Sequence, residues 1–466
     1  RTLDANTTGA GNVAIGEDSL SGNTTGDDNV AIGQNALKAN TEGQRLTAVG
    51  QNALAANTTA DSNSALGRNA LTANTTGHDN TAVGRAALTA NTTAADNTAV
   101  GAFCLDANTT GTANTAIGKS SLTNNSTADN NTAVGFYALA ANTTGANNTI
   151  VGSEAGDAIT TGDNNTAVGK DALGTNTVGD RNVAVGAYSL ATNNPSTNED
   201  SYNVAVGYAA GNAITTGYQN TAVGGLALDA LTTGHRNVAI GFAAISSAST
   251  GSDNTAVGNY ALIENTTGSY NTALGSYALD ANTTGNYNTA LGTSSLGANT
   301  TASENVAIGY EAFDSNTTGS RNTAVGSFAL DANTTANDNT AVGNHALGAN
   351  TTGGGNTALG KDALARNTTA DDNTAVGYLS LDHCTTGAGN TALGSEAGTA
   401  ITTGNYNVAI GKDALESVTT GADNVAIGYY TLQANTGSGN TAVGRSAMAA
   451  NTSGETNAAF GYQSLD

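Results

Sequence analysis

The chain has 466 residues, with 60 Gly, one Pro, no Trp and six Phe. Much of its 38% hydrophobic content is Ala, which is too small to build the large cores of several conventional globular domains. Charged residues make up only 11% of the chain, fewer than a disordered protein of this length would carry. The 37 acidic and 14 basic residues give a net charge of −23, and single cations scattered on an acidic chain exclude a nucleic-acid-binding surface.

One 17-residue unit repeats along the whole chain. It reads Asn-Thr/Val-Ala-Val/Ile/Leu-Gly-x-x-Ala-Leu-x-Ala-Asn-Thr-Thr-Gly-x-x, as in 271–287, and its places are called repeat positions 1 to 17. There are 27 copies, counting a degenerate one that starts at Leu46, with one step of 21 residues and one of 16. A fixed period of this length indicates a solenoid in which each repeat forms one coil. We predict a single continuous array over 1–466, interrupted by a surface loop at 194–202 that holds Pro195.

Each repeat contains two short runs with the alternation of β-strands, at 272–274 and 278–281 in the copy quoted above. Position 4 is apolar in every copy, so we expect positions 2 and 4 to point into the coil and position 3 to point outward. In the second run, positions 9 and 11 are expected to point one way and positions 8 and 10 the other. The predicted fold class is all-β, a parallel β-solenoid of about 27 coils.

Two turns connect these runs, at positions 5–7 and 14–17. Position 5 is Gly in all 27 copies, which predicts a positive φ or a close backbone neighbour. Position 15 accepts Ala as well as Gly, so an ordinary backbone is expected there. The structural turn glycines of the first five copies are Gly16, Gly33, Gly50, Gly67 and Gly84.

A coil cannot be stable alone. Its two sizeable buried side chains contribute roughly 1.5 to 3 kcal/mol each, against about 1 to 2 kcal/mol for ordering the backbone of every residue. Stacking adds backbone hydrogen bonds and a ladder of position-1 amides, which includes Asn63, Asn80, Asn97 and Asn114. In three copies Gly replaces Leu at position 9 and Ile replaces Asn at position 12, so these positions are expected to share one volume. The exchange is a tendency, because the copies with Leu231 and Val418 at position 12 keep a Leu at position 9. At about 4.8 Å per strand, the 26 steps predict a rod of about 125 Å.

Position 3 is Ala in 26 of 27 copies, although an outward position open to water would vary among polar residues. We interpret this stripe as an interface along which another copy of the chain approaches closely. Three copies around one axis would close the assembly. The candidate interface residues are Ala65, Ala82, Ala99 and Ala116.

The string Asn-Val-Ala-Ile-Gly at 12–16, 29–33, 237–241 and 424–428 resembles the signature of the head repeats of trimeric autotransporter adhesins. The full 17-residue unit is more similar to the repeat arrays of bacterial and phage tail-fibre-like proteins that end in an endosialidase-type intramolecular chaperone. The resemblance covers essentially the whole chain and implies a homotrimeric fibre of β-rolls. Since the chain stops at Asp466 within a repeat, we expect it to be a piece of a longer one.

No catalytic, metal or cofactor site is expected from the sequence. The four His lie in coils that are not adjacent, and Cys104 and Cys384 are 16 coils apart, too far to pair within one chain. Acidic turn residues such as Asp28 and Asp79 are expected to be solvated, because the spacing of calcium-binding β-rolls is missing. No run of 18 apolar residues occurs, so no membrane span is expected.

All fifteen Tyr lie at turn positions. Rings with a polar tip on exposed turns can bind a glycan or a neighbouring fibre, and the alternative is that they shield the turn backbone. The surface-binding candidates are Tyr137, Tyr208, Tyr429 and Tyr430. The frequent Thr at positions 13 and 14 leaves an ice-binding solenoid as a minor alternative, although adjacent Thr residues point to opposite sides of a strand.

These features predict a non-enzymatic fibre or filament shaft, extracellular or on a cell or virion surface, that spaces or presents a binding tip. The expected partners are further copies of the chain, most economically in a trimer, with cell-surface glycans or other fibres as possible contacts. The alternative is an adhesin head that binds a glycan or matrix receptor through its lateral surface. An enzyme would need clustered polar groups where the repeat departs from its pattern, and the sequence has none.

Overall fold

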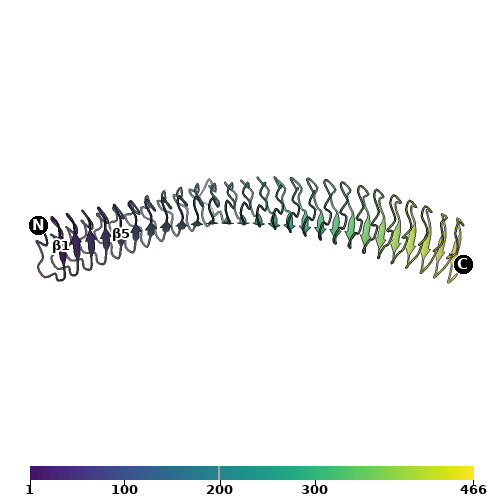
Figure 1. Ribbon diagram of the computed structural model, residues 1–466, viewed down its shortest axis with the longest axis horizontal. Coiled ribbons are helices and arrows are strands. Elements are labelled where there is room, and N and C mark those ends of the chain that lie inside the picture. Colours follow the sequence, from purple (N-terminus) through teal and green to yellow (C-terminus); the bar gives the residue numbers. More distant parts are fainter. Residues whose placement is uncertain (198–199) are drawn as a thin grey trace. The chain divides into compact units, whose positions relative to one another are not determined.

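The computed structural model describes residues 1–197 and 200–466. It is an all-β parallel solenoid with one three-residue strand in each coil of about 17 residues, and the described residues contain no helix. This confirms the fold class predicted from the repeat. The chain divides into two compact units, Arg1–Arg236 and Asn237–Asp466, and within each unit the strands of successive coils lie side by side (Figure 1).

The strands of the first unit are β1 (Val13–Ile15), β2 (Val30–Ile32), β3 (Thr47–Val49), β4 (Ser64–Leu66), β5 (Thr81–Val83), β6 (Thr98–Val100), β7 (Thr115–Ile117), β8 (Thr132–Val134), β9 (Thr149–Val151), β10 (Thr166–Val168), β11 (Val183–Val185), β12 (Val204–Val206) and β13 (Thr221–Val223). Those of the second unit are β14 (Val238–Ile240), β15 (Thr255–Val257), β16 (Thr272–Leu274), β17 (Thr289–Leu291), β18 (Val306–Ile308), β19 (Thr323–Val325), β20 (Thr340–Val342), β21 (Thr357–Leu359), β22 (Thr374–Val376), β23 (Thr391–Leu393), β24 (Val408–Ile410), β25 (Val425–Ile427), β26 (Thr441–Val443) and β27 (Ala458–Phe460).

Neighbouring strands pair in parallel, and each residue pairs with its equivalent in the next repeat. Ala256 of β15 pairs with Ala273 of β16, which pairs with Ala290 of β17. The register therefore arranges equivalent side chains of successive coils in columns. A substituted side chain therefore contacts the side chains at the same repeat position in the preceding and following coils.

The strands face the opposite way from the prediction. Ala273 at position 3 is completely buried inside the coil, whereas Leu274 at position 4 is 42% exposed on the outside. The interpretation of position 3 as an interface between chains was therefore wrong, because these methyl groups are enclosed within a single chain. The four residues assigned to that interface are at most 1% exposed: Ala65, Ala82, Ala99 and Ala116.

Position 3 is small because a leucine occupies the interior opposite to it. Ile150, the one larger residue at this position, belongs to the coil in which Gly156 replaces the position-9 Leu. A Cβ atom at Gly156 would lie 3.3 Å from Cδ1 of Ile150 and 3.0 Å from Cδ1 of Ile159 at position 12. Positions 3, 9 and 12 thus share one narrow volume, which confirms the expected competition between positions 9 and 12 and adds position 3 to it.

The second run is not a strand. Tyr277 at position 7 and Leu279 at position 9 have left-handed backbone, with φ of 56° and 53°. As a result, Ala278 and Leu279 both point into the coil and both are completely buried. The predicted alternation, which placed these two side chains on opposite sides, was therefore wrong. A left-handed Leu costs roughly 1 to 2 kcal/mol, which burial of its side chain, at about 1.5 to 3 kcal/mol, offsets.

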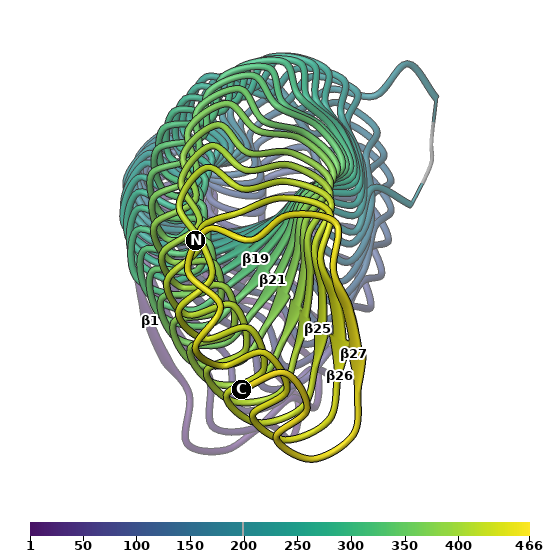
Figure 2. The same cartoon turned by 90° about the vertical axis from the view of Figure 1, so that its right-hand side faces the viewer.

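This side of the coil still forms hydrogen bonds to its neighbours. The N–H of Leu279 donates to the carbonyl of Ser295 in the next coil at 3.0 Å. Seen end-on, the strands of the second unit, among them β19, β21 and β25, lie on one side of the coil only (Figure 2). Within the described residues of each unit, the strands therefore form one β-sheet, and irregular but hydrogen-bonded backbone forms the other sides of the coils.

The position-5 glycines have both features expected of them. The φ angles are 122° to 145° in the first five copies, namely Gly16, Gly33, Gly50, Gly67 and Gly84. A Cβ atom at Gly50 would lie 2.5 Å from the carbonyl oxygen of Gly67 in the next coil. A side chain at this position is thus opposed by the backbone angle and by the neighbouring coil.

The predicted surface loop at 194–202 falls partly on residues 198–199, which lie outside the described residues. At its start, the N–H of Asn194 donates to the carbonyl of Thr215 at 2.8 Å. At its end, Asp200 forms an isolated parallel bridge with Asp180. The described ends of the insertion are therefore tied to the coils on either side of it.

We expect Gly50→Ala to lower the free energy of unfolding by about 1 to 3 kcal/mol, because of the backbone angle and the close carbonyl of the next coil. Chemical denaturation with hydrogen exchange of residues 47–67 measures the change. The control is Gly26→Ala at position 15. A Cβ atom there would lie 2.3 Å from the carbonyl oxygen of Gly43, but the φ angle of Gly26 is not positive, and Ala60 occupies the same position between two glycine-bearing coils, so this contact can relax. The control therefore isolates the effect of the backbone angle. The control should change the stability by less than about 1 kcal/mol, and equal effects of the two substitutions would contradict the prediction.

Candidate functional site

The most extensive repeated surface is the outward face of the strands. We call the side chains of positions 2 and 4 of β1–β13 in the first unit, and of β14–β27 in the second, the outer sheet face of each unit. Position 4 is apolar in all 27 copies, and position 2 is Thr, Val, Ser or Ala. Large apolar side chains of this face are exposed in the single chain, for example Leu66 at 50% and Leu393 at 48%. Each unit thus has an uncharged, largely apolar strip of a kind that marks a contact surface.

The position-1 asparagines form a ladder inside the coils. The backbone N–H and Nδ2 of Asn80 donate to Oδ1 of Asn63 at 2.9 and 3.1 Å. Asn97 bonds Asn80 in the same way at 3.0 and 3.2 Å, and Asn114 bonds Asn97 at 3.0 and 3.2 Å. Nδ2 of Asn80 also donates to the carbonyl of Ala94, at position 15 of its own coil. The four predicted ladder residues therefore link successive coils and close each coil on itself.

A second ladder, which the sequence analysis did not predict, runs along position 12. Nδ2 of Asn40 donates to Oδ1 of Asn23 at 2.9 Å and to the carbonyl of Gly43 at 3.0 Å, and Asn57 donates to Asn40 in turn at 2.9 Å. These side chains are completely buried. The recurring Asn before Thr-Thr-Gly was the available signal, because a buried amide requires partners on both sides.

The position-12 ladder ends abruptly at three places. Buried side-chain oxygens without a partner among the described residues are Oδ1 of Asn142, Asn193 and Asn367. The next coils have an apolar residue at position 12 in each case, namely Ile159, Ile214 and Cys384. Each interruption thus leaves the last amide of a run without the donor that the following coil would supply.

The four Tyr candidates do not form one site. Tyr137 and Tyr208 are 38% and 61% exposed and are four coils apart in the first unit, whereas Tyr429 and Tyr430 are half-buried in the second. Tyr208 lies edge-on to Tyr188 of the previous coil, with 6.0 Å between ring centroids, and Tyr429 contacts Tyr430 at 3.9 Å. These contacts among neighbouring rings join adjacent coils or adjacent residues.

Neither thiol has the environment of a reactive cysteine. Burial raises the pKa of the Cys104 thiol to about 12 and that of the Cys384 thiol to about 11. Both side chains are completely buried, at positions 8 and 12. Both thiols therefore stay neutral at physiological pH, whereas a nucleophilic or metal-ligating cysteine reacts as the thiolate.

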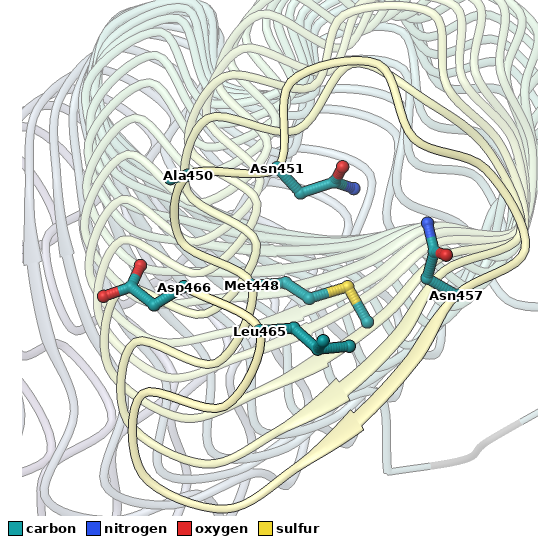
Figure 3. A pocket seen from close by; sticks show the side chains of 6 residues that line it. All are labelled: Met448, Ala450, Asn451, Asn457, Leu465 and Asp466. Carbon is teal, nitrogen blue, oxygen red and sulfur yellow. The ribbon is translucent and has the colours of Figure 1, made fainter.

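Two hollows are places where packing is interrupted. One, of about 320 Å³, lies inside the last coil and is lined by Met448, Asn451, Asn457 and Leu465 (Figure 3). These are the repeat positions that the following coil covers elsewhere in the unit, so the hollow is coil interior.

The other is a surface groove of about 470 Å³ in the second unit, with Gly348 and Ala365 between the carboxyls of Asp331 and Asp382. Partial burial raises the pKa of both carboxyls. Arg366 and His383 approach Asp382, at 3.9 and 3.4 Å. The groove follows from small residues at position 10 of two successive coils.

Three potential ligand side chains converge on one turn of the first unit. His78, Asp79 and Asp96 have donor atoms that all lie within 4.8 Å of one another, and all three side chains are exposed. This group was not predicted from the sequence, where the histidines and the acidic turn residues, Asp79 among them, were considered separately. The signal was the 17-residue interval between Asp79 and Asp96, which places them at the same repeat position of neighbouring coils.

Comparison with known proteins adds no family or relative, because no family model and no curated protein matches the chain. Among the residues that the structure describes, no helix has the length and apolar character needed to cross a membrane.

The shared interior volume can be tested at Gly211 and Ile214. A Cβ atom at Gly211 would lie 3.0 Å from Cδ1 of Ile214 and 3.0 Å from Cδ2 of Leu190. We expect Gly211→Leu alone to destabilise the protein by about 1 to 3 kcal/mol through overpacking. Addition of Ile214→Asn should recover at least about 1 kcal/mol, because it restores the common Leu and Asn pair and supplies a donor to Asn193.

A double-mutant cycle by chemical denaturation, with hydrogen exchange of the affected coils, measures this coupling. Ile214→Asn alone is the third member of the cycle and should also be destabilising. Additive effects of the two substitutions would show that the positions are independent.

Proposed function

We propose that the chain is a non-enzymatic structural shaft in which several copies assemble through their outer sheet faces. The observation that supports this is the absence of any charged residue at positions 2 and 4 of all 27 repeats, although one chain leaves these side chains exposed, as at Leu274, or partly exposed, as at Val83. The turns of the same coils vary freely and carry most of the charge. Exclusion of charged residues from two outward positions, but not from the turns, is expected where the outward side chains are buried in a contact with another molecule.

The occupant that fits this face is another copy of the chain. A partner must offer an apolar contact once per coil over the thirteen strands of the first unit and the fourteen of the second. A second copy in the same register has this spacing by construction. Burial of one partly exposed Val, Ile or Leu contributes roughly 1 kcal/mol, and the gain repeats in every coil.

Three copies are the proposed number. A closed ring leaves none of the strip in water, and the resemblance to trimeric adhesin heads and tail-fibre arrays also implies a trimer. That resemblance is the basis for placing the shaft outside the cell or on a virion. Its role there is to space or present a binding tip.

An adhesin head that binds a glycan through its sides is the second candidate. It is favoured by Tyr rings at exposed turns, such as Tyr208 at 61% and Tyr406 at 66% exposed. Ice binding is the third, and it would need the Thr side chains of positions 13 and 14 to form a regular face open to water. A glycan array and a thermal-hysteresis assay measure these two activities directly.

Cysteine cross-linking tests the assembly. Because both native thiols are buried and neutral, Leu274→Cys at the outer sheet face is expected to be the reactive thiol. Oxidation and a trifunctional maleimide should link chains into dimers and trimers, and light scattering should give three times the 45.6 kDa chain mass. The control Thr301→Cys, on an exposed turn, should link far less. A monomeric mass, or equal linking of both variants, would overturn the proposal.

A further inference from the structure

We propose that His78, Asp79 and Asp96 form a binding site for a divalent transition-metal ion such as Zn²⁺ on a turn of the first unit. The donor atoms of the three side chains lie within 4.8 Å of one another. Nδ1 of His78 is 2.9 Å from Oδ2 of Asp79. One imidazole nitrogen with two carboxylate oxygens is a donor set that suits Zn²⁺ and related ions, at about 2.0 to 2.2 Å from each ligand.

The repeat itself brings the two carboxyls together. Asp79 and Asp96 both occupy position 17, in adjacent coils, and both have left-handed backbone with φ of 54° and 61°. The N–H of Asp96 donates to the carbonyl of His78 at 3.2 Å, which joins the two turns directly. The positions of the three side chains are therefore fixed by a hydrogen-bonded backbone, and only exposed side-chain torsions must adjust to bind an ion.

This pair of carboxyls is singular within the chain. Acidic residues occupy position 17 in several other copies, but nowhere else do two of them follow one another in consecutive coils. Two carboxylates one strand spacing apart repel each other by about 1 kcal/mol in water. Apart from His78, no basic side chain pairs with either carboxyl among the described residues, and the nearby Arg45 bonds Asp61. A bound cation would remove this repulsion.

There is also room for an ion with its waters. A hollow of about 320 Å³ adjoins the group and is lined by Thr59, Ser62, Thr76, His78 and Asp79, together with the paired Arg45 and Asp61. Three protein ligands on an exposed turn leave the remaining positions of the ion to water. The ion would tie the turns of two neighbouring coils together.

A natural control exists at the same repeat position. His235 also occupies position 16, but Arg236 follows it where Asp79 follows His78. A cation in place of the first carboxylate cannot contribute to a metal site. The substitution His235→Ala thus removes an equivalent imidazole without touching the proposed ligands.

Calorimetric titration of the chelator-treated full chain with Zn²⁺ tests the site. We expect one saturable site per chain, weakened at least about tenfold by His78→Gln and by Asp96→Asn and unchanged by His235→Ala. All three side chains are exposed, so circular dichroism and the chain mass should be unaffected by these substitutions.

The proposal is overturned if the unmodified chain shows no saturable Zn²⁺ site, or if both ligand variants bind as it does. It is also overturned if Ca²⁺ binds as tightly as Zn²⁺ and His78→Gln leaves that binding unchanged, since two carboxylates alone would then account for it. None of these outcomes depends on whether the chains assemble.

Discussion

The interior of each coil is narrow, and much of the remaining structure follows from that limit. Leu279 fills most of the space in its coil, which leaves room for a small residue opposite on the strand, Ala273, and for the amide of Asn282 at position 12. In three coils Gly replaces this Leu and Ile replaces the Asn, although Leu228 and Leu231 are both buried in one coil. Where Gly156 empties the space, Ile150 and Ile159 both move into it. A core this narrow cannot enclose unpaired polar backbone or accept an extra methyl group at no cost.

Polar ladders make such a core stable. The buried asparagines at positions 1 and 12 form hydrogen bonds to the asparagine of the preceding coil and to a backbone carbonyl of their own coil. Their amides thus provide hydrogen-bond partners for buried polar groups, which apolar side chains in a core of this width could not do. The three orphaned oxygens occur only where an apolar residue replaces the next amide, as Ile159 does after Asn142. Cooperation between coils is therefore built from hydrogen bonds as much as from burial.

The narrow interior of the coil also explains why apolar side chains lie on the outer sheet face. A strand of three residues has one side chain pointing in and two pointing out, and the inward place is already restricted to Ala. Apolar residues at position 4 therefore cannot serve the core of their own chain. Their recurrence is the basis for the proposal that a second copy of the chain, which has the same period, covers them.

The sequence alone determined the fold class, the length of the coil, the positive φ of the position-5 glycines and the existence of an asparagine ladder. These four properties follow from the repeat itself, because a residue type that recurs at the same position in 27 copies indicates a structural requirement there, whichever way its side chain points. Only the tertiary structure decided which face of the strand is inside. Period-2 alternation separates two faces without identifying the core, and the larger apolar residues of position 4 pointed to the wrong one.

The structure also decided the backbone of positions 7 to 9 and the meeting of His78 with Asp96. Left-handed residues such as Leu279 break the alternation on which a strand prediction depends, and they are stable only because neighbouring coils bury the side chain. His78 and Asp96 are 18 residues apart and come together because stacking places one turn over the next. Side-chain direction and proximity between coils are properties of the stack, and one repeat considered by itself contains neither.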